Sequence, residues 1–426
     1  MMHFSPKGFP PPSGPLDPRR IAQHGWNVLR GDLPTPVAVL KQTPLRNNIA
    51  WMKRFCDRWG LSLAPHGKTT LSPELYRLQL EAGAWGITFA SVFQAGLGFA
   101  NGVPNLLIAN QVFQPIDLAT LHGWQQQKPE SRALFLVDSQ QQLGLIRDWL
   151  QRHPQASFEV LLELGVANKR AGVRDDAQAL ALAREIHRTP GLRLVGIEAY
   201  EGGLLAPDEA QERAAVGHLM ARIAQVAKAC EQEGLFETEE IILTAGGSTL
   251  FDLVALLLKP TLVEPHRKIL RSGCYLTHDH LHLERQFERL IQRTPSEGRL
   301  QPALELVCHV ASTPEPGLAI LNLGRRDVAF DQAWPKPLQR LRAAASPSRT
   351  HHPPVPQAVP AHWAIDNLND QHAYLRYDPQ AGDPAPEVGE LLLCGFSHPC
   401  TTFDKWRWMP VVDDTYTVVD AVTIHF

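Results

Sequence analysis

The sequence has no long hydrophobic run and no excess of charge of either sign. No stretch of about 18 apolar residues occurs, and the N-terminal residues lack the apolar segment of a signal peptide. The 41 Lys and Arg residues nearly balance the 44 Asp and Glu residues, so the chain lacks the basic field that draws proteins to nucleic acid. We therefore expect a cytoplasmic protein that binds neither nucleic acid nor a membrane.

Cysteine is also scarce, with six residues spread over 426 positions and no CxxC pair. This number and spacing do not support a disulfide framework. We expect most of these side chains to be reduced thiols, with one available as a metal ligand.

Residues 60–276 alternate between short apolar runs and longer segments with helical periodicity. This alternation is typical of parallel strands joined by crossover helices, and several helical segments begin at a Ser or Asp that suits an N-cap. The expected strands are Leu61–Ala64, Gly86–Ser91, Asn105–Ala109, Ala133–Val137, Phe158–Leu164, Leu192–Tyr200, Ile241–Thr244 and Ile269–Gly273. They predict an α/β protein with a closed (β/α)8 barrel of the TIM type, whose active site lies at the carboxyl ends of the strands.

Beyond the barrel the pattern changes to the alternation of half-buried strands, which predicts a second, C-terminal β domain. The expected strands there are Ala303–Ser312, Leu318–Leu323, Ala361–Asp366, Gly389–Cys394 and Thr415–Ile424. The proline-rich stretch 334–360 is expected to be an extended loop or a partly disordered insertion. The apolar run Pro36–Leu40 is expected to add the N-terminal segment to the β domain. The predicted division is therefore 1–43 for this segment, 44–290 for the barrel and 291–426 for the β domain.

The segment LSLAPHGKTT, residues 61–70, places Lys68 just beyond the first expected strand and next to His66. A lysine at a strand end, among small and polar residues, can be desolvated and become nucleophilic toward aldehydes. Such a lysine is a natural anchor for the Schiff base of pyridoxal phosphate, whereas most lysines are solvated surface charges. Both interpretations of Lys68 stay open on this segment alone.

Two glycine-containing turns follow the seventh and eighth expected strands, TAGGST at 244–249 and RSGCY at 271–275. In barrels of this type the loops after these two strands often hold a phosphate, because backbone N–H groups there converge on an anion. Gly246, Gly247 and Gly273 would permit that close approach, although each could also serve only in a tight turn. In a closed barrel these turns and the lysine face each other across one mouth.

Near the end of the β domain, His398 and Cys400 lie two residues apart in the segment CGFSHPCTTFD. In an extended strand both side chains point to the same side, and imidazole together with thiolate suits a borderline metal such as zinc. Two protein ligands would leave positions open for water and substrate, as in a catalytic metal site. A loop histidine beside an incidental cysteine is the alternative.

Seven motifs occur in a fixed order along the chain, namely LSLAPHGKTT, GVANKRAGV, IEAYEGG, TAGGST, SGCY, NLNDQH and SHPC. In this order they resemble the motifs of the D-serine dehydratase and D-threonine aldolase family. Its members are alanine-racemase-type, fold-type III pyridoxal phosphate enzymes with a metal-binding C-terminal β domain. The resemblance covers nearly the whole chain beyond the N-terminal segment.

The resemblance implies a role for individual residues. It makes Lys68 the Schiff-base lysine, and it makes His398 and Cys400 the ligands of a divalent metal, with zinc expected. The cofactor-binding residues that it implies are His66, Lys68, Arg170, Tyr200, Gly246, Gly247, Ser248, Gly273, Cys274 and Tyr275. The His-x-Cys form is similar to the zinc-dependent D-serine dehydratases, whereas the aldolases tend to carry an aspartate in place of the cysteine. A homodimer is also implied.

The expected activity is that of a lyase acting on a D-3-hydroxy amino acid. Loss of a metal-polarised β-hydroxyl would give a 2-oxo acid and ammonia, as in a D-serine dehydratase. If the metal instead helps to deprotonate that hydroxyl, the Cα–Cβ bond breaks and the products are glycine and an aldehyde, as in a D-threonine aldolase. An amino-acid racemase would share the barrel and the cofactor but has no use for His398 and Cys400. A non-catalytic cofactor-carrying protein of the same barrel type is a further alternative, against which the second domain counts.

Overall fold

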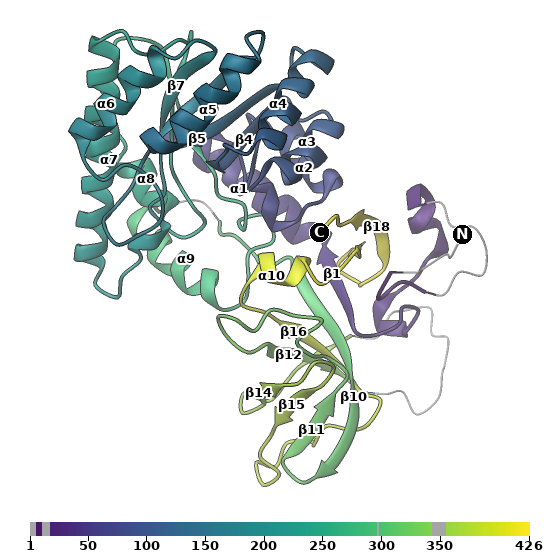
Figure 1. Ribbon diagram of the computed structural model, residues 1–426. Coiled ribbons are helices and arrows are strands. Elements are labelled where there is room, and N and C mark those ends of the chain that lie inside the picture. Colours follow the sequence, from purple (N-terminus) through teal and green to yellow (C-terminus); the bar gives the residue numbers. More distant parts are fainter. Residues whose placement is uncertain (1–5, 11–17, 296–297, 343–354) are drawn as a thin grey trace.

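Eight parallel strands form a barrel in the upper part of Figure 1. The computed structural model describes residues 6–10, 18–295, 298–342 and 355–426. The strands follow one another in the order β2-β9-β8-β7-β6-β5-β4-β3. Their bounds are β2 Ser62–Leu63, β3 Ile87–Phe89, β4 Asn105–Gln111, β5 Arg132–Val137, β6 Phe158–Leu164, β7 Leu192–Ala199, β8 Ile241–Thr244 and β9 His266–Leu270.

The ring closes between β2 and β3. His66 and Thr88 form a parallel bridge, and the backbone N–H of Thr88 donates to the carbonyl of Pro65 at 2.9 Å. On the other side of the short strand β2, His66 N donates to Arg271 O at 3.1 Å. The predicted (β/α)8 barrel with a second β domain is confirmed.

Helices surround the barrel (Figure 1). Their bounds are α1 Gln42–Trp59, α2 Pro73–Glu81, α3 Val92–Ala100, α4 Pro115–Gln127, α5 Gln140–Arg152, α6 Asp176–His187, α7 Glu209–Gln232, α8 Phe251–Leu257 and α9 His282–Arg293. The side chains of Ser91, Ser139 and Asp175 accept hydrogen bonds from the first turns of α3, α5 and α6. The N-caps expected at Ser139 and Asp175 are therefore present, and each one satisfies a backbone N–H that the helix cannot. Ser72, expected to cap α2, makes no capping hydrogen bond with its side chain.

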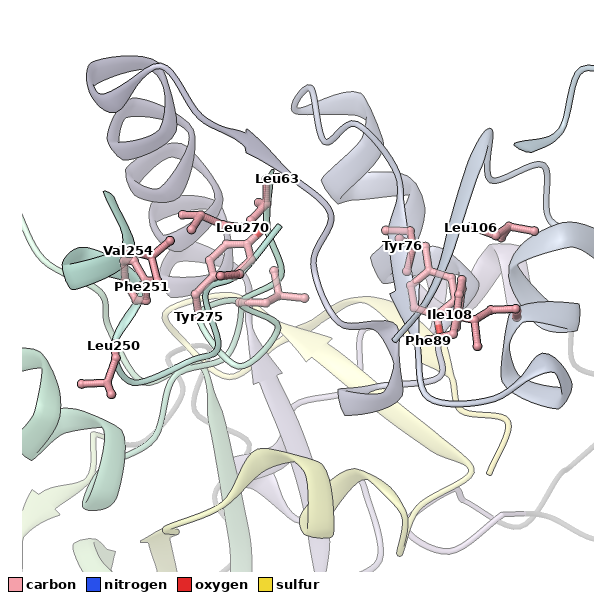
Figure 2. Close-up of a cluster of buried hydrophobic side chains, with 14 of the residues drawn as sticks. Leu63, Tyr76, Phe89, Leu106, Ile108, Leu250, Phe251, Val254, Leu270 and Tyr275 are labelled. Carbon is pink, nitrogen blue, oxygen red and sulfur yellow. The ribbon is translucent and has the colours of Figure 1, made fainter. Parts of the chain in front are cut away.

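The strands bury both of their faces. Leu107 packs inside the barrel with apolar residues of the neighbouring strands, whereas Leu106 and Ile108 on either side of it join the larger core beneath the helices. Figure 2 shows part of this outer layer, in which Tyr76 and Phe89 pack edge to face. Burial on two sides explains why the strands read as continuous apolar runs rather than as alternating ones.

The last barrel strand is displaced relative to its predicted position. The expected strand Ile269–Gly273 begins instead at His266 and ends at Leu270, so Arg271 to Gly273 lie in the turn that follows. The strand begins with three half-buried polar residues that pair through their backbones with β8. Apolar patterning therefore missed its first half.

The second domain is a sheet that includes the N-terminal strand. The strands are β1 Val37–Lys41, β10 Leu304–Glu315, β11 Leu318–Leu321, β12 Lys336–Leu341, β13 Gln357–Ala358, β14 Ala364–Leu368, β15 Ala373–Arg376, β16 Leu391–Gly395, β17 Trp408–Val412 and β18 Val418–Thr423. Strand β1 lies between β10, to which it is antiparallel, and β17, to which it is parallel. Strand β1 continues directly into α1, so the chain passes from the second sheet to the barrel without a linker.

Within the stretch 334–360 the expectation of a loop is wrong where the structure describes it. Strands β12 and β13 lie there and pair with each other, and β12 also pairs with β16, while residues 343–354 lie outside the described part of the chain. The buried Arg340 of β12 pairs with Glu390, and its guanidinium lies 4.5 Å from the ring of Trp363. Strand β12 was missed in the sequence because it contains Pro337 and the charged Arg340, neither of which is typical of a buried strand.

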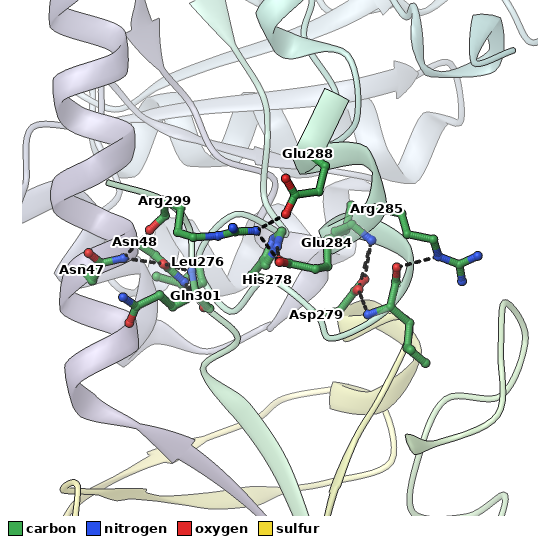
Figure 3. Close-up of polar contacts among 12 residues, drawn as sticks. Asn47, Asn48, Leu276, His278, Asp279, Glu284, Arg285, Glu288, Arg299 and Gln301 are labelled. Atoms are coloured by element: carbon green, nitrogen blue, oxygen red, sulfur yellow. Dashed lines mark hydrogen bonds and ion pairs between the residues drawn. The ribbon is translucent and has the colours of Figure 1, made fainter. Parts of the chain in front are cut away.

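A polar network ties the end of the barrel to the second sheet (Figure 3). The side chain of Asn48 on α1 donates to Leu276 O at 3.0 Å and to Gln301 O at 2.7 Å, and it accepts from Gln301 N at 2.8 Å. Nearby, His278 pairs with Glu284 of α9 at 2.8 Å. These contacts fix the segment between β9 and β10. None of the helices in the described residues is both long and apolar enough to cross a membrane.

The position of β1 predicts a large effect of truncating its side chains. Leu40 is fully buried, so Leu40→Ala should lower the free energy of unfolding by about 2–5 kcal/mol. Leu145 on α5 is 52% exposed, and the matched variant Leu145→Ala should change it by less than about 0.5 kcal/mol. Urea unfolding followed by circular dichroism measures both. Equal stability of the two variants would contradict a central role for β1.

Candidate active site

Lys68 lies just beyond the carboxyl end of β2, on the 3-10 turn η3 (Gly67–Thr69). The tyrosine hydroxyl of Tyr76 donates to Gly67 O at 2.9 Å, and a Cβ on Gly67 would come within 2.7 Å of Ile87. Close packing and this hydrogen bond therefore fix the backbone, while the lysine side chain is half-buried. The predicted placement of Lys68 at a strand end agrees with the structure.

The turn after β9 lies directly against the lysine turn. A Cβ on Gly273 would lie 2.5 Å from the carbonyl oxygen of His66, so only glycine permits this approach. The backbone N–H of Cys274 donates to Ser248 Oγ of the turn after β8 at 3.3 Å. The structure thus brings together three segments that lie far apart in the sequence.

Tyr275 differs from its neighbours in the same turn. Its ring lies in the hydrophobic cluster of Figure 2, and its hydroxyl accepts a hydrogen bond from Gln79 at 3.0 Å. Burial raises the pKa of this hydroxyl above its ordinary range. Only the backbone of Tyr275 can therefore contribute to a ligand site at the mouth.

The glycine turn after β8 already binds an anionic group of the protein. Gly246 N donates to one carboxylate oxygen of Glu201 at 2.9 Å, and Gly247 N donates to the other at 2.6 Å. Gly246 has φ of +98°, a conformation that favours glycine. The two N–H groups predicted to meet a phosphate thus converge on an anion, and a phosphate at these donors would replace the Glu201 carboxylate.

Arg170 and Tyr200 lie together at a cavity of about 160 Å³ in the barrel mouth. The guanidinium carbon of Arg170 is 4.8 Å from the centre of the Tyr200 ring, and Glu163 and Lys169 also line the cavity. Burial and the charge of Glu201 raise the pKa of Tyr200, which the charge of Arg170 partly opposes. Tyr200 is therefore a neutral phenol that can donate a hydrogen bond.

His66 is an imidazole without a complete set of partners. The residue is half-buried, and its Nδ1 atom is buried and has no hydrogen-bond partner among the described residues. Burial lowers the pKa of His66 well below its usual range, and the charges of Lys68 and Arg271 lower it further. The neutral ring thus leaves one buried nitrogen available to a ligand.

His398 and Cys400 lie at the start of a short helix, α10 (Pro399–Phe403), and not on the extended strand that the sequence predicted. His398 has extended backbone, and the proline after it starts the helix, which is a favoured position for proline. His398 Nδ1 lies 2.6 Å from Asp331 Oδ2, and Thr401 Oγ1 donates to the other oxygen at 3.0 Å. The carboxylate fixes the orientation of the imidazole and leaves Nε2 for a ligand.

Cys400 reaches the barrel mouth from the second domain. Its sulfur lies 3.4 Å from Thr69 Oγ1 and 3.6 Å from the sulfur of Cys274. The hydrogen bond from Cys274 lowers the pKa of the Cys400 thiol, burial raises it, and Thr69 and the charge of Lys68 lower it further. Within the described part of the chain, no three His, Cys, Asp or Glu side chains form a group that could hold a metal. A metal at His398 and Cys400 would therefore have two protein ligands.

The chain is similar in sequence to several known proteins. A serine dehydratase domain family matches residues 303–412. A D-threonine aldolase from Arthrobacter sp. is 28% identical over 406 residues, covering 95% of this chain and 93% of that protein. A D-threo-3-hydroxyaspartate dehydratase from Delftia sp. strain HT23 is 31% identical over 206 residues, covering 48% of this chain and 53% of that protein. The resemblance to the D-serine dehydratase and D-threonine aldolase family is confirmed.

Solved structures of several proteins share the fold of this chain. The D-threonine aldolase of Filomicrobium marinum superposes with a TM-score of 0.73 at 21% identity, covering 94% of this chain and 96% of that chain. A metal-free cysteine-to-alanine mutant of D-threo-3-hydroxyaspartate dehydratase gives 0.71 at 22% identity, covering 94% and 100%. An alanine racemase of Clostridium difficile 630 gives 0.60 at 12% identity, covering 92% and 98%.

Three buried charged residues at the mouth were not identified through the family resemblance. Arg271 donates to Thr244 Oγ1 at 2.9 Å and to Ala199 O at 3.1 Å, and it pairs with Glu198. Glu163 accepts a hydrogen bond from Gln111. The signal was present, because Glu163 and Glu198 are acidic residues inside the apolar runs FEVLLEL and LRLVGIEA. Carboxylates at such positions are costly to bury and indicate a site.

Glu163 generates a pH-dependent prediction. Burial, and then the charges of Glu198 and Asp138, raise the pKa of Glu163 from 4.5 to about 8. The folded protein therefore binds a proton that the unfolded chain has lost between about pH 4.5 and 8, so stability should fall as the pH rises through this window. Glu163→Gln should reduce the loss of stability between pH 5 and 8 by about 1 kcal/mol or more, since one pKa unit corresponds to ~1.4 kcal/mol.

Urea unfolding at several pH values measures this difference. The exposed residue Glu239 provides the matched control, because Glu239→Gln should leave the pH dependence of stability unchanged. Identical pH profiles for the wild type and Glu163→Gln would show that Glu163 ionises in the folded protein as it does in the unfolded chain.

Proposed function

We propose that the protein is a pyridoxal phosphate- and metal-dependent lyase that acts on a D-3-hydroxy amino acid. The observation that carries this proposal is the meeting of Lys68, the glycine turns after β8 and β9, and Cys400 of the second domain at one barrel mouth. Relatives named as aldolases and dehydratases of D-3-hydroxy amino acids support the same class of reaction.

The residues present fit the cofactor. Lys68 would hold its aldehyde carbon, and Arg170 and Tyr200 would lie beside its ring in the cavity of about 160 Å³. The unpartnered Nδ1 of His66 supplies a further hydrogen-bonding atom. The backbone N–H groups at Gly246 and Gly247, which converge on a carboxylate, suit a phosphate. When bound, pyridoxal phosphate supplies an electron sink that stabilises a carbanion at the substrate Cα.

Ser248, Gly273, Cys274 and Tyr275 complete the proposed phosphate site. Ser248 Oγ already accepts a hydrogen bond from Cys274 N, so these two turns are fixed relative to each other. The close contact of Gly273 with His66 holds both turns against the lysine. Lys68, at the edge of the mouth, is the group that would remove the α-proton of the substrate.

The residues at α10 also fit a divalent metal, with zinc expected. His398 and Cys400 offer one imidazole nitrogen and one thiolate, and Asp331 orients the imidazole. A metal held there would supply Lewis-acid polarisation of a substrate hydroxyl. Support comes from two solved structures of D-threo-3-hydroxyaspartate dehydratase, a histidine-to-alanine mutant and a metal-free cysteine-to-alanine mutant, whose substituted positions lie two residues apart.

Within this class we propose the dehydratase reaction, which converts D-serine or a related D-3-hydroxy amino acid into a 2-oxo acid and ammonia. The His-x-Cys form of the metal site favours it. The retro-aldol reaction is the second candidate, because the D-threonine aldolase of Arthrobacter sp. matches 95% of this chain. We further propose a cytoplasmic homodimer, which a sedimentation measurement showing only monomer would contradict.

Borohydride treatment tests the cofactor-binding role of Lys68. The purified protein, or the protein reconstituted with pyridoxal phosphate, should be yellow, and borohydride should attach the cofactor covalently to Lys68. Lys169 lines the cavity beside Arg170 and Tyr200 and is the matched control, so Lys68→Arg should abolish labelling while Lys169→Arg should keep it. Peptide mapping by mass spectrometry locates the label. A label on Lys169, or a protein that cannot be made to bind the cofactor, would reject the assignment.

Cys400→Ala tests the metal role. Cofactor content and colour should stay nearly unchanged, because they depend on Lys68 and the phosphate turns. Ammonia release from D-serine or a related substrate should fall by about 100-fold or more, since Lewis-acid stabilisation is worth several kcal/mol. Added zinc should rescue the chelated wild type but not the variant. Cys230→Ala, a change at a buried thiol on the remote helix α7, should keep the zinc-dependent activity.

The products of this experiment separate the two candidate reactions. Ammonia and a 2-oxo acid indicate the dehydratase, whereas glycine and an aldehyde indicate the aldolase. Full ammonia release in the presence of a chelator would contradict the metal role in either case.

A further inference from the structure

Two cysteines from different parts of the molecule meet at the barrel mouth. Cys274 follows the last barrel strand β9, and Cys400 lies in the first turn of α10 in the second domain. Their sulfur atoms are 3.6 Å apart. The two residues are 126 positions apart, and strands β10 to β16 of the second sheet lie between them. The contact therefore joins the second domain to the barrel at a point away from the chain connections at β1 and before β10.

We propose that Cys274 and Cys400 are an oxidation site, at which a peroxide forms a reversible disulfide between the barrel and the second domain. A disulfide has a sulfur–sulfur distance of about 2.05 Å, so the two atoms must approach each other by about 1.6 Å. Cys400 belongs to a helix of only five residues, and small rotations of two side chains and this short helix supply such an approach.

The two thiols differ in access. Cys274 is 8% exposed, whereas Cys400 is half-buried and faces the mouth beside Thr69. A peroxide therefore reaches Cys400 first, and Cys274 is in place to react next. Cys308 and Cys394 also lie in contact with each other, but both are fully buried in the sheet of the second domain.

The chemistry balances with hydrogen peroxide as the oxidant. The sulfur of Cys400 attacks one peroxide oxygen, the O–O bond breaks, and a sulfenic acid and one water form. The sulfur of Cys274 then attacks the sulfenic sulfur, the S–O bond breaks, and the hydroxyl leaves as a second water with the Cys274 proton. The two thiols together lose two electrons and two protons, and the peroxide gains them.

The consequence for catalysis rests on the proposed function. A disulfide would remove the Cys400 thiolate from the metal and would constrain Cys274 within the proposed phosphate turn. Zinc bound at Cys400 should in turn slow the oxidation. Oxidation of these two cysteines would thereby cause loss of the metal and of activity.

The experiment uses the full-length protein treated with hydrogen peroxide, once after chelation and once with zinc. Non-reducing peptide mapping should show a peptide that joins Cys274 to Cys400, in larger amount without zinc, and dithiothreitol should remove it. The proposal is overturned if peroxide takes Cys400 to sulfinic acid while Cys274 stays a free thiol, or if the only disulfide joins Cys308 to Cys394.

Variants provide the matched controls. Cys274→Ser and Cys400→Ser should each abolish the crosslink, and Cys230→Ala should leave it unchanged because Cys230 is buried on α7, in a different part of the barrel. Circular dichroism checks that each variant folds. If a variant does not fold, the peptide map of the wild type still decides the question.

Zinc binding distinguishes failure of this proposal from failure of the proposed function. Oxidised wild type should show an apparent zinc dissociation constant raised by more than about tenfold. Mutation of a residue that only contacts a metal ligand already weakens metal binding by about this factor, and loss of the ligand itself should weaken it more. A crosslink without any change in zinc affinity would reject Cys400 as a metal ligand and leave the oxidation site standing. Zinc binding that requires Cys400, with no crosslink under peroxide, would reject the oxidation site alone.

Discussion

The barrel and its mouth depend on the backbone contacts of one very short strand. Strand β2 has two residues, yet it must pair with β9 on one side and meet β3 on the other for the ring to close. The residues just after it complete the closure, through the bridge at His66 and the hydrogen bond from His66 N to Arg271 O. The same few residues therefore close the barrel and carry Lys68, so the geometry of the site follows from the geometry of closure.

Buried charged side chains lie next to the residues that close the barrel, since Arg271 is the backbone partner of His66. Glu198 and Arg271 pair where both are almost completely buried, and Glu201 is held by the N–H groups of Gly246 and Gly247. Buried ion pairs add little net stability, because desolvation offsets the attraction, although removing one partner is strongly destabilising. Buried charges at the carboxyl ends of barrel strands are typical of functional sites, so their position here favours a role in the site over a role in stability.

The second domain completes the mouth because β1 places it there. This strand lies within the second sheet and leads directly into α1 of the barrel, and the network around Asn48 fixes the return connection to β10. With both connections fixed, α10 lies against the lysine turn and Cys400 contacts Thr69. A catalytic centre shared between two units becomes possible without a long or flexible linker.

The sequence by itself determined the barrel and the place of Lys68. Parallel strands buried on both faces leave continuous apolar runs, and the ends of those runs locate residues such as Lys68, Gly247 and Gly273 at one edge. Local patterns are sufficient to place these residues, because all residues at the carboxyl ends of parallel barrel strands lie at the same end of the barrel.

Only the tertiary structure decided the contacts between distant segments. Strand β12 was missed because its buried Arg340 is compensated by Glu390 and Trp363, which lie far away in the sequence. The contact of Cys274 with Cys400, the capture of Gly246 and Gly247 by Glu201, and the start of a helix at Pro399 have the same origin. A charge, a thiol or a backbone N–H has no pattern along the chain that identifies its partner, because the partner is selected by the packing of the two domains.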